Sequence, residues 1–279
     1  MSVINSFNDE YITYSHSIAE KPLQYSFSMH AHEHHEVYCF LSGSGNYIVE
    51  GTEYRLEPRR ILIMRSNEAH MPKIDGDIPY ERIAIHFKTK FVERLDPECR
   101  LLRPFFVRQL GRMNLYDKNR IRSGFIHDCL RRMAEVNGDY YEKKVLISSY
   151  FYNILCEIYR AFENYSQEDA GACASSISEI IDYINNNLSE NLSLSHLEDR
   201  FFISKSHLLR LFKRATGSTV WDYITVKRVN LAHSMLCDGV GAAEAASACG
   251  FNDYSAFYKA YRRRFGFSPT ENMRKQYIE

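Results

Sequence analysis

The first third of the chain carries short apolar runs that are typical of β-strands. Between about residues 25 and 87, runs rich in β-branched and aromatic side chains are separated by Gly, Pro and Ser; the clearest are 36–41, 46–50, 53–56, 61–64 and 80–87. Short runs with turn residues between them indicate antiparallel strands of a barrel or sandwich. We therefore predict a β-barrel over residues 1–90.

Residues 91–169 change to the period of α-helices. Apolar residues recur every three or four positions between Ile147 and Phe162. A weaker stripe includes Ile121 and Phe125. Each stripe would form one apolar face of a helix. The pattern leaves open whether these helices cover the barrel, form a dimer interface or do both. Covering the domain's own core is the more common use, and we also predict that this segment makes the protein a homodimer.

A polar stretch of small residues separates this segment from the last hundred residues. Residues 167–176 have no apolar period, which places a linker at 170–176. The helical pattern returns from residue 177 and continues to residue 279. A chain of 279 residues is long enough for two domains at roughly 100–200 residues per domain.

Residues 194–216 have the pattern of a helix-turn-helix unit. A short amphipathic helix with Leu194 and Phe201 on its apolar face leads to a turn, and Ser204 is suited to cap a second helix. The second helix has one apolar side and one polar, cationic side, as a helix in the DNA major groove requires. Its outward residues include Lys205, Ser206, His207, Arg210, Lys213 and Arg214.

The pattern recurs over residues 242–265. Asp253 is suited to cap the second helix of this unit, and Gly266 to end it. The outward residues of that helix include Tyr254, Ser255, Lys259, Arg262 and Arg263. Trp221 is one of the apolar positions that predict a single long helix between the units. Two units in one block would place their recognition helices about one DNA turn, ~34 Å, apart.

The charge of the whole chain hides a local asymmetry. Its 35 Lys and Arg balance 35 Asp and Glu, which by itself speaks against nucleic-acid binding. Residues 1–176 carry 22 basic and 24 acidic residues, whereas residues 177–279 carry 13 and 11. Two stretches without acidic residues, 205–214 and 259–264, contain four cations each. The overall balance is therefore compatible with DNA binding by the second domain.

Cysteine usage and hydropathy indicate the compartment. The 7 cysteines are scattered without a C-x-x-C pair, which argues against a disulfide framework or a cysteine zinc site. The N-terminus lacks the basic and apolar regions of a secretory signal. The longest apolar stretch without charge, residues 145–156, is shorter than the ~20 residues that span a bilayer. We expect a cytoplasmic protein that does not associate with membranes.

Residues 30–35 contain four of the 11 histidines. His30 and His32 are two residues apart and would share one face of a strand, Glu36 follows, and His70 lies downstream. Three imidazoles and a carboxylate that converge in a barrel would suit Zn²⁺, Mn²⁺, Fe²⁺ or Ni²⁺. The same side chains could instead bind the hydroxyl groups of a ligand. A required cofactor is not expected. A bound divalent metal is one alternative for these side chains, and binding of a ligand's hydroxyl groups is the other.

Two strings in the last hundred residues resemble a known family. SKSHLLRLFKRATG (204–217) and GFNDYSAFYKAYRRRFGFSP (250–269) are similar to the paired helix-turn-helix domain of the AraC/XylS family of bacterial transcription regulators, over about residues 177–276. The resemblance implies DNA-facing positions for Ser206, His207, Arg210, Tyr254, Ser255 and Lys259. Arg210 is the residue most expected to reach a guanine, because Arg to the guanine edge is the commonest specific contact.

The histidine spacing, H-x-H-x3-E-x6-G, resembles the first cupin motif, with His70 in the position of the second motif's histidine. The two resemblances together imply an α+β protein: a cupin-like jelly roll followed by helices, then an all-α tandem helix-turn-helix domain. In the family, the cupin-like domain generally senses a small molecule, often a sugar, without metal chemistry. The expected effector-binding residues are His30, His32, Glu36, Tyr38 and His70.

We therefore expect a sequence-specific DNA-binding transcription regulator rather than an enzyme. It would respond to a sugar-like effector, contact RNA polymerase and act as an activator rather than a repressor. The alternative is a cupin metalloenzyme, an isomerase or dioxygenase, in which the C-terminal helices are an accessory. Such an enzyme would need a metal at His30, His32, Glu36 and His70, so the metal content of the protein separates the two hypotheses.

Overall fold

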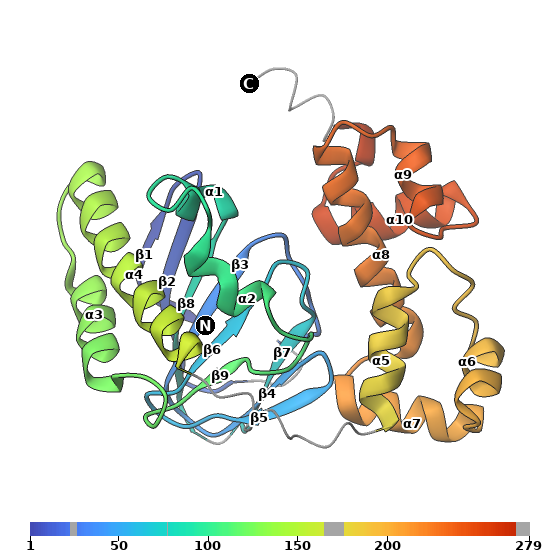
Figure 1. Cartoon of the computed structure of the whole chain (residues 1–279), viewed down its shortest axis with the longest axis horizontal. Helices are drawn as coiled ribbons and strands as arrows, with labels where there is room; N and C mark the ends of the chain where they lie inside the picture. Colours follow the sequence, from blue (N-terminus) through green and yellow to red (C-terminus); the bar gives the residue numbers. More distant parts are fainter. Residues whose placement is uncertain (23–26, 77, 165–175, 272–279) are drawn as a thin grey trace.

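The computed structural model describes residues 1–22, 27–76, 78–164 and 176–271, with strands before helices along the chain (Figure 1). The strands are β1 (Ser2–Asn8), β2 (Ile12–Ala19), β3 (His35–Ser42), β4 (Gly45–Val49), β5 (Thr52–Arg55), β6 (Ile61–Met64), β7 (His70–Ile74), β8 (Tyr80–Phe87) and β9 (Leu115–Tyr116). The helices are α1 (Thr89–Glu93), the 3₁₀ turn η2 (Arg100–Leu102), α2 (Arg103–Phe106), α3 (Ser123–Glu135), α4 (Tyr140–Glu163), α5 (Ser176–Asn186), α6 (Leu194–Phe201), α7 (Lys205–Thr216), α8 (Val220–Cys237), α9 (Ala242–Ala248) and α10 (Tyr254–Phe265). The predicted α+β class is confirmed.

The strands form two antiparallel sheets. One has the order β1-β2-β8-β3-β6-β9 and the other the order β5-β4-β7. Tyr38 and Phe40 of β3 belong to a buried core with Tyr47 of β4, so this core lies between the sheets. Because side chains alternate along a strand, Val37 and Cys39 belong to the opposite face of β3.

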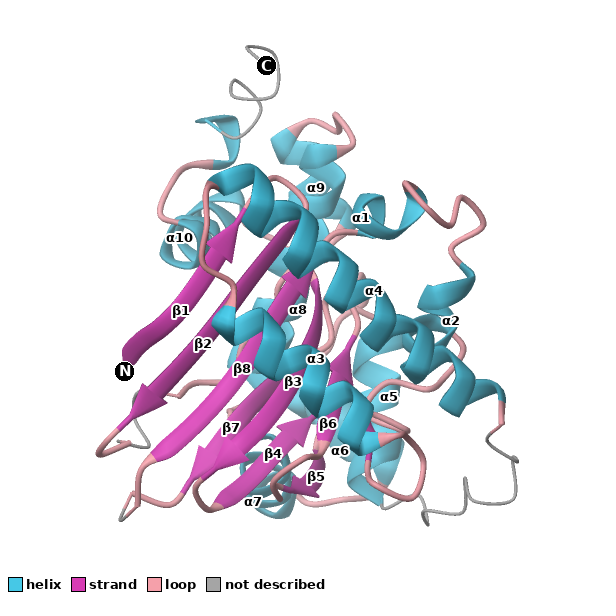
Figure 2. Cartoon of the chain, turned by 90° about the vertical axis from the view of Figure 1, so that its left-hand side faces the viewer, coloured by secondary structure: helices cyan, strands magenta, loops and turns pink. Residues whose placement is uncertain are grey.

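Helices α3 and α4 lie across that opposite face of the larger sheet (Figure 2). Ile147 and Phe151 of α4 share one core with strand residues such as Val37. The helices therefore cover the core of their own domain. The prediction for Phe125 was wrong, because its side chain is 40% exposed and Ile126 takes the buried position on α3.

Strands β1, β2 and β9 fall outside the predicted strand region. The sequence of strand β1 shows no apolar alternation, and Phe7 is its only buried residue. Strand β2 pairs with β8 along its whole length and so extends the sheet. Strand β9 lies in the segment predicted to be helical and pairs with β6 through Tyr116 opposite Ile61. The residues after β8 thus add both a strand and helices to the first domain, which spans residues 1–164.

Helices α5 to α10 form the second domain, residues 176–271. Helices α6 and α7 pack with α5 through Ile180, Leu197 and Phe212. Helices α9 and α10 pack with α8 through Phe257 and Tyr261. The predicted linker at 170–176 lies outside the described residues except for Ser176, with which α5 begins. None of the described helices is both long and apolar enough to cross a membrane.

Helix α8 buries polar side chains that the apolar pattern does not predict. Trp221, expected on its inner face, is 66% exposed. Lys227, Arg228 and Asn230 are buried instead. The Arg228 guanidinium donates hydrogen bonds to three backbone carbonyls, those of Leu188 (2.8 Å), Glu190 (2.7 Å) and Gly250 (2.7 Å). This residue therefore ties α8 to the loops on either side of it.

Candidate effector site and nucleic-acid interface

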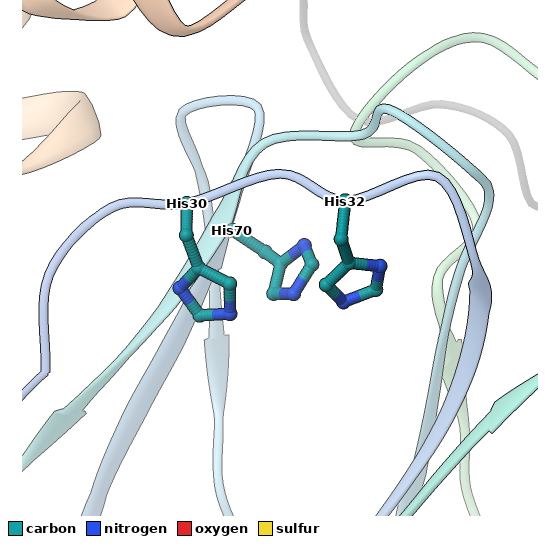
Figure 3. Close-up of side chains that lie close together, drawn as sticks. All are labelled: His30, His32 and His70. Carbon is teal, nitrogen blue, oxygen red and sulfur yellow. The ribbon is translucent and has the colours of Figure 1, made fainter. Parts of the chain in front are cut away.

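His30, His32 and His70 lie together in the first domain, with their rings pointing toward one another (Figure 3). The backbones of His30 and His70 form a bridge with hydrogen bonds of 3.0 and 2.8 Å. The ring centroid of His70 lies 4.4 Å from that of His30 and 5.0 Å from that of His32. One nitrogen of each ring lies within 4.8 Å of the others. The three histidines identified by spacing are therefore neighbours in space.

Backbone contacts fix the tautomer of all three rings. Each Nδ1 lies within hydrogen-bond distance of a backbone carbonyl: His30 to Ser28 (2.8 Å), His32 to His34 (2.9 Å) and His70 to Glu68 (2.7 Å). A carbonyl oxygen only accepts, so Nδ1 carries the hydrogen and Nε2 of the neutral ring keeps its lone pair. Contacts of this kind orient histidines that bind metals or ligands.

Glu36 lies beside these rings and is 1% exposed. Its Oε2 atom lies 3.1 Å from Nε2 of His32, 3.1 Å from Nε2 of His70 and 3.3 Å from Nε2 of His86. Burial would raise the pKa of Glu36, but His86, His32 and His70 lower it well below its usual range. We call these five residues, His30, His32, Glu36, His70 and His86, the histidine cluster.

The charge state of the rings follows from their surroundings. Burial lowers the pKa of His30 to about 3 and also lowers the pKa of His32. Burial would lower the pKa of His70 as well, but the Glu36 carboxylate raises it. At neutral pH the rings of His30 and His32 are therefore uncharged and lie next to the ionised Glu36 carboxylate.

His86 was missed by the sequence analysis. It lies on β8, opposite Glu36 in the ladder between β3 and β8. No spacing motif connects residue 86 with residues 30–36, so only the strand pairing reveals it.

Tyr38, predicted to bind the effector, lies deeper between the two sheets and is fully buried. Its hydroxyl lies 2.5 Å from the hydroxyl of Tyr80, and its ring centroid lies 4.5 Å from that of Tyr47. The Arg82 guanidinium lies 5.9 Å from the centre of the Tyr38 ring. Tyr38 therefore belongs to a buried aromatic group in the barrel, and a ligand could reach it only through the barrel interior.

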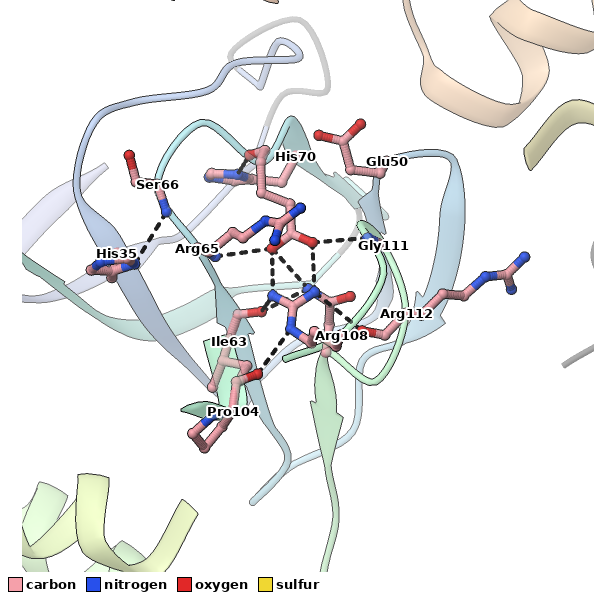
Figure 4. A network of polar contacts seen from close by, with 12 residues as sticks. His35, Glu50, Ile63, Arg65, Ser66, His70, Pro104, Arg108, Gly111 and Arg112 are labelled. Carbon is pink, nitrogen blue, oxygen red and sulfur yellow. Dashed lines mark hydrogen bonds and ion pairs between the residues drawn. The ribbon is translucent and has the colours of Figure 1, made fainter. Parts of the chain in front are cut away.

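A buried ion pair supports the loop before His70 (Figure 4). The Arg108 guanidinium donates to the Glu68 carboxylate at 2.6 and 2.7 Å, and neither side chain is exposed. Gly111 N donates to the same carboxylate at 2.8 Å. Burial would raise the pKa of Glu68, but Arg108 lowers it to about 2. Because the Glu68 carbonyl also accepts from His70 Nδ1, the ion pair helps to set the orientation of that ring.

A second buried carboxylate joins the two domains. Glu50, in the turn after β4, accepts hydrogen bonds from the Tyr223 hydroxyl and from Lys227 Nζ (2.6 Å), Asn185 Nδ2 (3.0 Å) and Ala69 N (2.5 Å). Lys227 Nζ also donates to the Asn67 carbonyl at 2.7 Å. Three of these donors come from α5 and α8, and Ala69 precedes a residue of the histidine cluster. The sequence gives no signal for this contact.

Ala31, between His30 and His32, makes a second connection between the domains. Its carbonyl accepts from Asn230 Nδ2 of α8 at 2.9 Å and from the Arg264 guanidinium of α10. Ala31 has no exposed surface. The backbone that carries two rings of the histidine cluster therefore also contacts the helices of the second domain.

Helices α7 and α10 begin and end as predicted. Asp253 accepts hydrogen bonds from Ser255 N and Ala256 N, both at 3.0 Å, and Gly266 ends α10 in the left-handed conformation. Ser204 occupies the equivalent position of α7 without a capping hydrogen bond from its side chain. The residues predicted to face DNA are all exposed: Lys205, Ser206, His207, Arg210, Lys213, Arg214, Tyr254, Ser255, Lys259, Arg262 and Arg263. Their contacts with DNA stay a prediction.

A two-sheet domain with a buried polar cluster, joined to two helix-turn-helix units, defines a ligand-binding transcription regulator. Residues 17–143 match the model of the AraC-like ligand binding domain, and residues 197–275 match a helix-turn-helix domain model. The chain belongs to the AraC family of DNA-binding transcription regulators.

Individual proteins are also similar to this chain. The HTH-type transcriptional activator RhaS of Yersinia pestis (strain Pestoides F) is 24% identical over 262 residues, which cover 91% of this chain and 92% of RhaS. The crystal structure of ToxT from Vibrio cholerae O395 is 13% identical and covers 95% of this chain and 98% of its own, with a TM-score of 0.37. The DNA-binding domain of AdpA, solved with a target DNA, is 24% identical, covers 38% and 96%, and has a TM-score of 0.36.

Proposed function

We propose that this protein is an effector-responsive transcription activator. Helices α7 and α10 bind DNA, and the histidine cluster binds the effector. The observation that carries the proposal is the position of Ala31, whose neighbours His30 and His32 belong to the cluster while its carbonyl contacts α8 and α10. Activation is the function named for RhaS, with which the chain aligns over 91% of its length.

DNA recognition combines two kinds of contact. Arg210 and Lys259 are exposed on the two recognition helices and would read base edges, while neighbouring cations neutralise phosphates. The phosphate contacts supply affinity that falls with salt concentration, and the base contacts supply specificity. The proposed interface comprises Lys205, Ser206, His207, Arg210, Lys213, Arg214, Tyr254, Ser255, Lys259, Arg262 and Arg263.

The chemistry of the histidine cluster suits a polyhydroxylated effector such as a sugar. Lone pairs on Nε2 of His30, His32 and His70 accept hydrogen bonds from hydroxyl groups, and Glu36 is a charged acceptor beside them. A few convergent polar groups in an otherwise apolar enclosure are typical of small-molecule sites. Tyr38 would contact an effector that extends into the barrel.

The effector would change the contact between the domains. A ligand drawn between His32 and His70 shifts the backbone of Ala31 and Ala69, and these residues bond to Asn230, Arg264 and Glu50. The ligand acts only through its different affinity for the two arrangements. This route runs directly through α8 and α10. We further propose a cytoplasmic homodimer, paired through the helical segment 91–169, whose DNA-bound form contacts RNA polymerase.

DNA binding by two variants tests this function. Duplexes from the intergenic regions next to the protein's own gene serve as probes in titrations of Arg210→Ala and Lys259→Ala. Each variant should lose about 1–3 kcal/mol of specific binding, the usual value of a direct base contact. Lys118→Ala, at an exposed residue outside the recognition helices, is the control and should bind as wild type does. Unchanged binding by both variants would overturn the proposed interface.

The histidine cluster also fits a divalent cation. The Nε2 lone pairs of His32 and His70 face an ionised Glu36 at 3.1 Å, and two acceptors at this distance repel unless a cation or proton lies between them. We propose that His30, His32, Glu36 and His70 hold Zn²⁺, Mn²⁺, Fe²⁺ or Ni²⁺, with His86 as a further nitrogen. A bound ion would supply a Lewis acid for a hydroxyl or carboxylate of the effector.

Elemental analysis of protein purified without chelators tests the cation site. About one ion per chain is expected in the wild type and in His16→Gln, a control outside the cluster whose ring pairs with Glu81. Loss of the ion is expected in His32→Gln and His70→Gln. Wild-type protein without stoichiometric metal would refute the cation site, and with it the metalloenzyme hypothesis.

A further inference from the structure

Three side chains that the proposed function does not use lie together where the two domains meet. Glu33 belongs to the loop before β3, and His233 and Cys237 belong to α8. One carboxylate oxygen of Glu33, one ring nitrogen of His233 and the sulfur of Cys237 all lie within 4.8 Å of one another. We call these three residues the Glu33 site. An oxygen, a nitrogen and a sulfur atom in one place are the ligand types that Zn²⁺ takes in proteins.

Helix α8 positions two of the three side chains. His233 and Cys237 are four residues apart, so they are neighbours on the same face of the helix. His233 Nε2 lies 4.0 Å from Cys237 Sγ. Cys237 is the last residue of α8, where the partial negative charge of the helix end favours a cation. The second domain therefore supplies two ligands, and Glu33 of the first domain supplies the third.

The distances in the Glu33 site suit a bound ion better than a direct hydrogen bond. Nε2 of His233 lies 3.5 Å from Oε2 of Glu33. A hydrogen bond between these atoms would bring them to about 2.7–3.2 Å. Ligands that surround a tetrahedral Zn²⁺ at about 2.0–2.3 Å lie roughly 3.3–3.6 Å from one another. The 3.5 Å between Glu33 and His233 is within that range, and a small rotation of the Cys237 side chain brings its sulfur to the same spacing.

Contacts on the far side of the ring orient His233. Its Nδ1 atom lies 2.5 Å from the hydroxyl of Tyr261, which is fully buried on α10. Its ring stacks on that of Phe265, with a distance of 4.0 Å between the centroids. The Tyr261 oxygen can accept a hydrogen bond from Nδ1–H, which leaves the Nε2 lone pair directed at Glu33 and Cys237. Metal-binding histidines are typically held by such a hydrogen bond at the other nitrogen.

The Glu33 site is distinct from the histidine cluster. The two groups of side chains share no residue, and the cluster contains no sulfur ligand. Glu33 follows His32 in the sequence, but its carboxylate contacts α8, whereas the His32 ring contacts Glu36. A measurement that detects sulfur ligation therefore reports on the Glu33 site alone.

We propose that Glu33, His233 and Cys237 bind Zn²⁺ and so connect the loop before β3 to α8. Cys237 binds as the thiolate, and its proton is released to solvent. Three protein ligands leave the fourth position of a tetrahedral ion to a water molecule. The Glu33 side chain is 32% exposed and Cys237 is exposed, so the ion exchanges with solvent. We expect purification to remove this ion and added metal to restore it.

A bound ion would stabilise the contact between the domains. Its full set of ligands exists only while Glu33 of the first domain lies beside α8 of the second. A ligand that binds only one arrangement stabilises that arrangement in proportion to its concentration and affinity. The proposal does not depend on what the histidine cluster or the recognition helices bind.

Titration of the full-length protein with Co²⁺, a coloured substitute for Zn²⁺, tests the site. A thiolate bound to Co²⁺ gives a charge-transfer band in the near ultraviolet, which nitrogen and oxygen ligands do not give. The wild type should show this band, and added Zn²⁺ should remove it, because Zn²⁺ binds such ligands more tightly than Co²⁺. Cys237→Ser should abolish the band. Glu33→Gln should weaken Co²⁺ binding by about tenfold or more. Cys156→Ser, at a half-buried cysteine of α4, is the control and should bind as wild type does.

Alkylation of the cysteines gives a second measurement that depends on position. Zn²⁺ should protect Cys237 from iodoacetamide and leave the reactivity of Cys156 unchanged, as peptide mass spectrometry would show. Zn²⁺ should also raise the thermal unfolding midpoint of the wild type and not that of Cys237→Ser. The replaced side chains are close in size to the natural ones and are not buried, so both variants should unfold at the midpoint of the metal-free wild type.

Two results would overturn the zinc site. One is the absence of a thiolate band in the wild type, and the other is a band that persists in Cys237→Ser. Unchanged Co²⁺ binding in Glu33→Gln would refute the connection between the domains. A protein that shows the band but binds no DNA would refute the proposed function and leave the zinc site supported.

Discussion

The Lys227 ammonium lies 2.6 Å from the Glu50 carboxylate, across the interface between the two domains. The Lys227 side chain is 6% exposed and the Glu50 side chain is not exposed at all. A buried ion pair adds little net stability, but removing one partner leaves a charge without compensation. This pair therefore makes the docked arrangement of the domains sensitive to a single side chain.

Replacement of Lys227 should separate or destabilise the domains. Lys227→Met leaves the buried Glu50 without its cation and should lower the free energy of unfolding by about 3–5 kcal/mol. The measurement is urea denaturation of the full chain. Lys118→Met, at an exposed lysine, should change stability by less than about 0.5 kcal/mol.

The double variant Lys227→Met, Glu50→Gln distinguishes an ion pair from general packing. Removing both charges should recover part of the lost stability, because no buried charge stays unpaired. Additive losses in the two single variants would show that the two groups do not interact.

Glu68→Gln should destabilise the first domain and change its response to acid. It leaves the buried Arg108 unpaired, at a cost of about 3–5 kcal/mol at neutral pH. The wild-type pKa of Glu68 is lowered to about 2 from the usual 4.5 of a glutamate, so its contribution to stability is full above pH 4.5 and declines as pH falls toward 2. Urea denaturation at several pH values checks both effects. A variant with the wild type's stability at neutral pH would contradict the first.

Asp253→Ala should shorten or loosen the second recognition helix. The side chain satisfies two backbone N–H groups of α10, and loss of such a cap costs about 0.5–2 kcal/mol. Ser204→Ala is the matched control on α7, where the side chain makes no capping hydrogen bond, so a smaller loss is expected. Thermal denaturation of both variants compares the two caps directly. Equal losses would contradict the difference between them.

Tyr38→Phe should destabilise the barrel without changing its shape. The Tyr80 hydroxyl, 2.5 Å from that of Tyr38, would lose this buried hydrogen bond, at a cost of about 1–3 kcal/mol. Tyr141→Phe is the control, since Tyr141 is 76% exposed. The unfolding midpoints of the two variants measure the difference, and similar midpoints would refute the role of the hydroxyl pair.

Local sequence patterns were sufficient to predict those parts of the structure that depend on residues close together in the chain. The caps and apolar faces of α7 and α10 recur within a few positions along the chain, so Asp253 and Gly266 could be assigned before the fold was known. The spacing of His30, His32 and Glu36 likewise identified part of one cluster. Strand β1 has no apolar alternation and contains a single buried residue, which explains why that strand was missed.

The sequence by itself determined that a strand-rich region is followed by helices and then by two helix-turn-helix units, and it determined the chemical type of the cluster. Only the tertiary structure placed His86 beside Glu36, through a ladder between strands that are far apart in sequence. Only the docked domains bring Lys227 to Glu50 and His233 to Glu33. The physical reason is that the sequence does not show whether a polar side chain is buried in the folded protein. The partner of such a side chain comes from a distant segment and is determined by tertiary packing. A local hydrophobic period does not predict this packing.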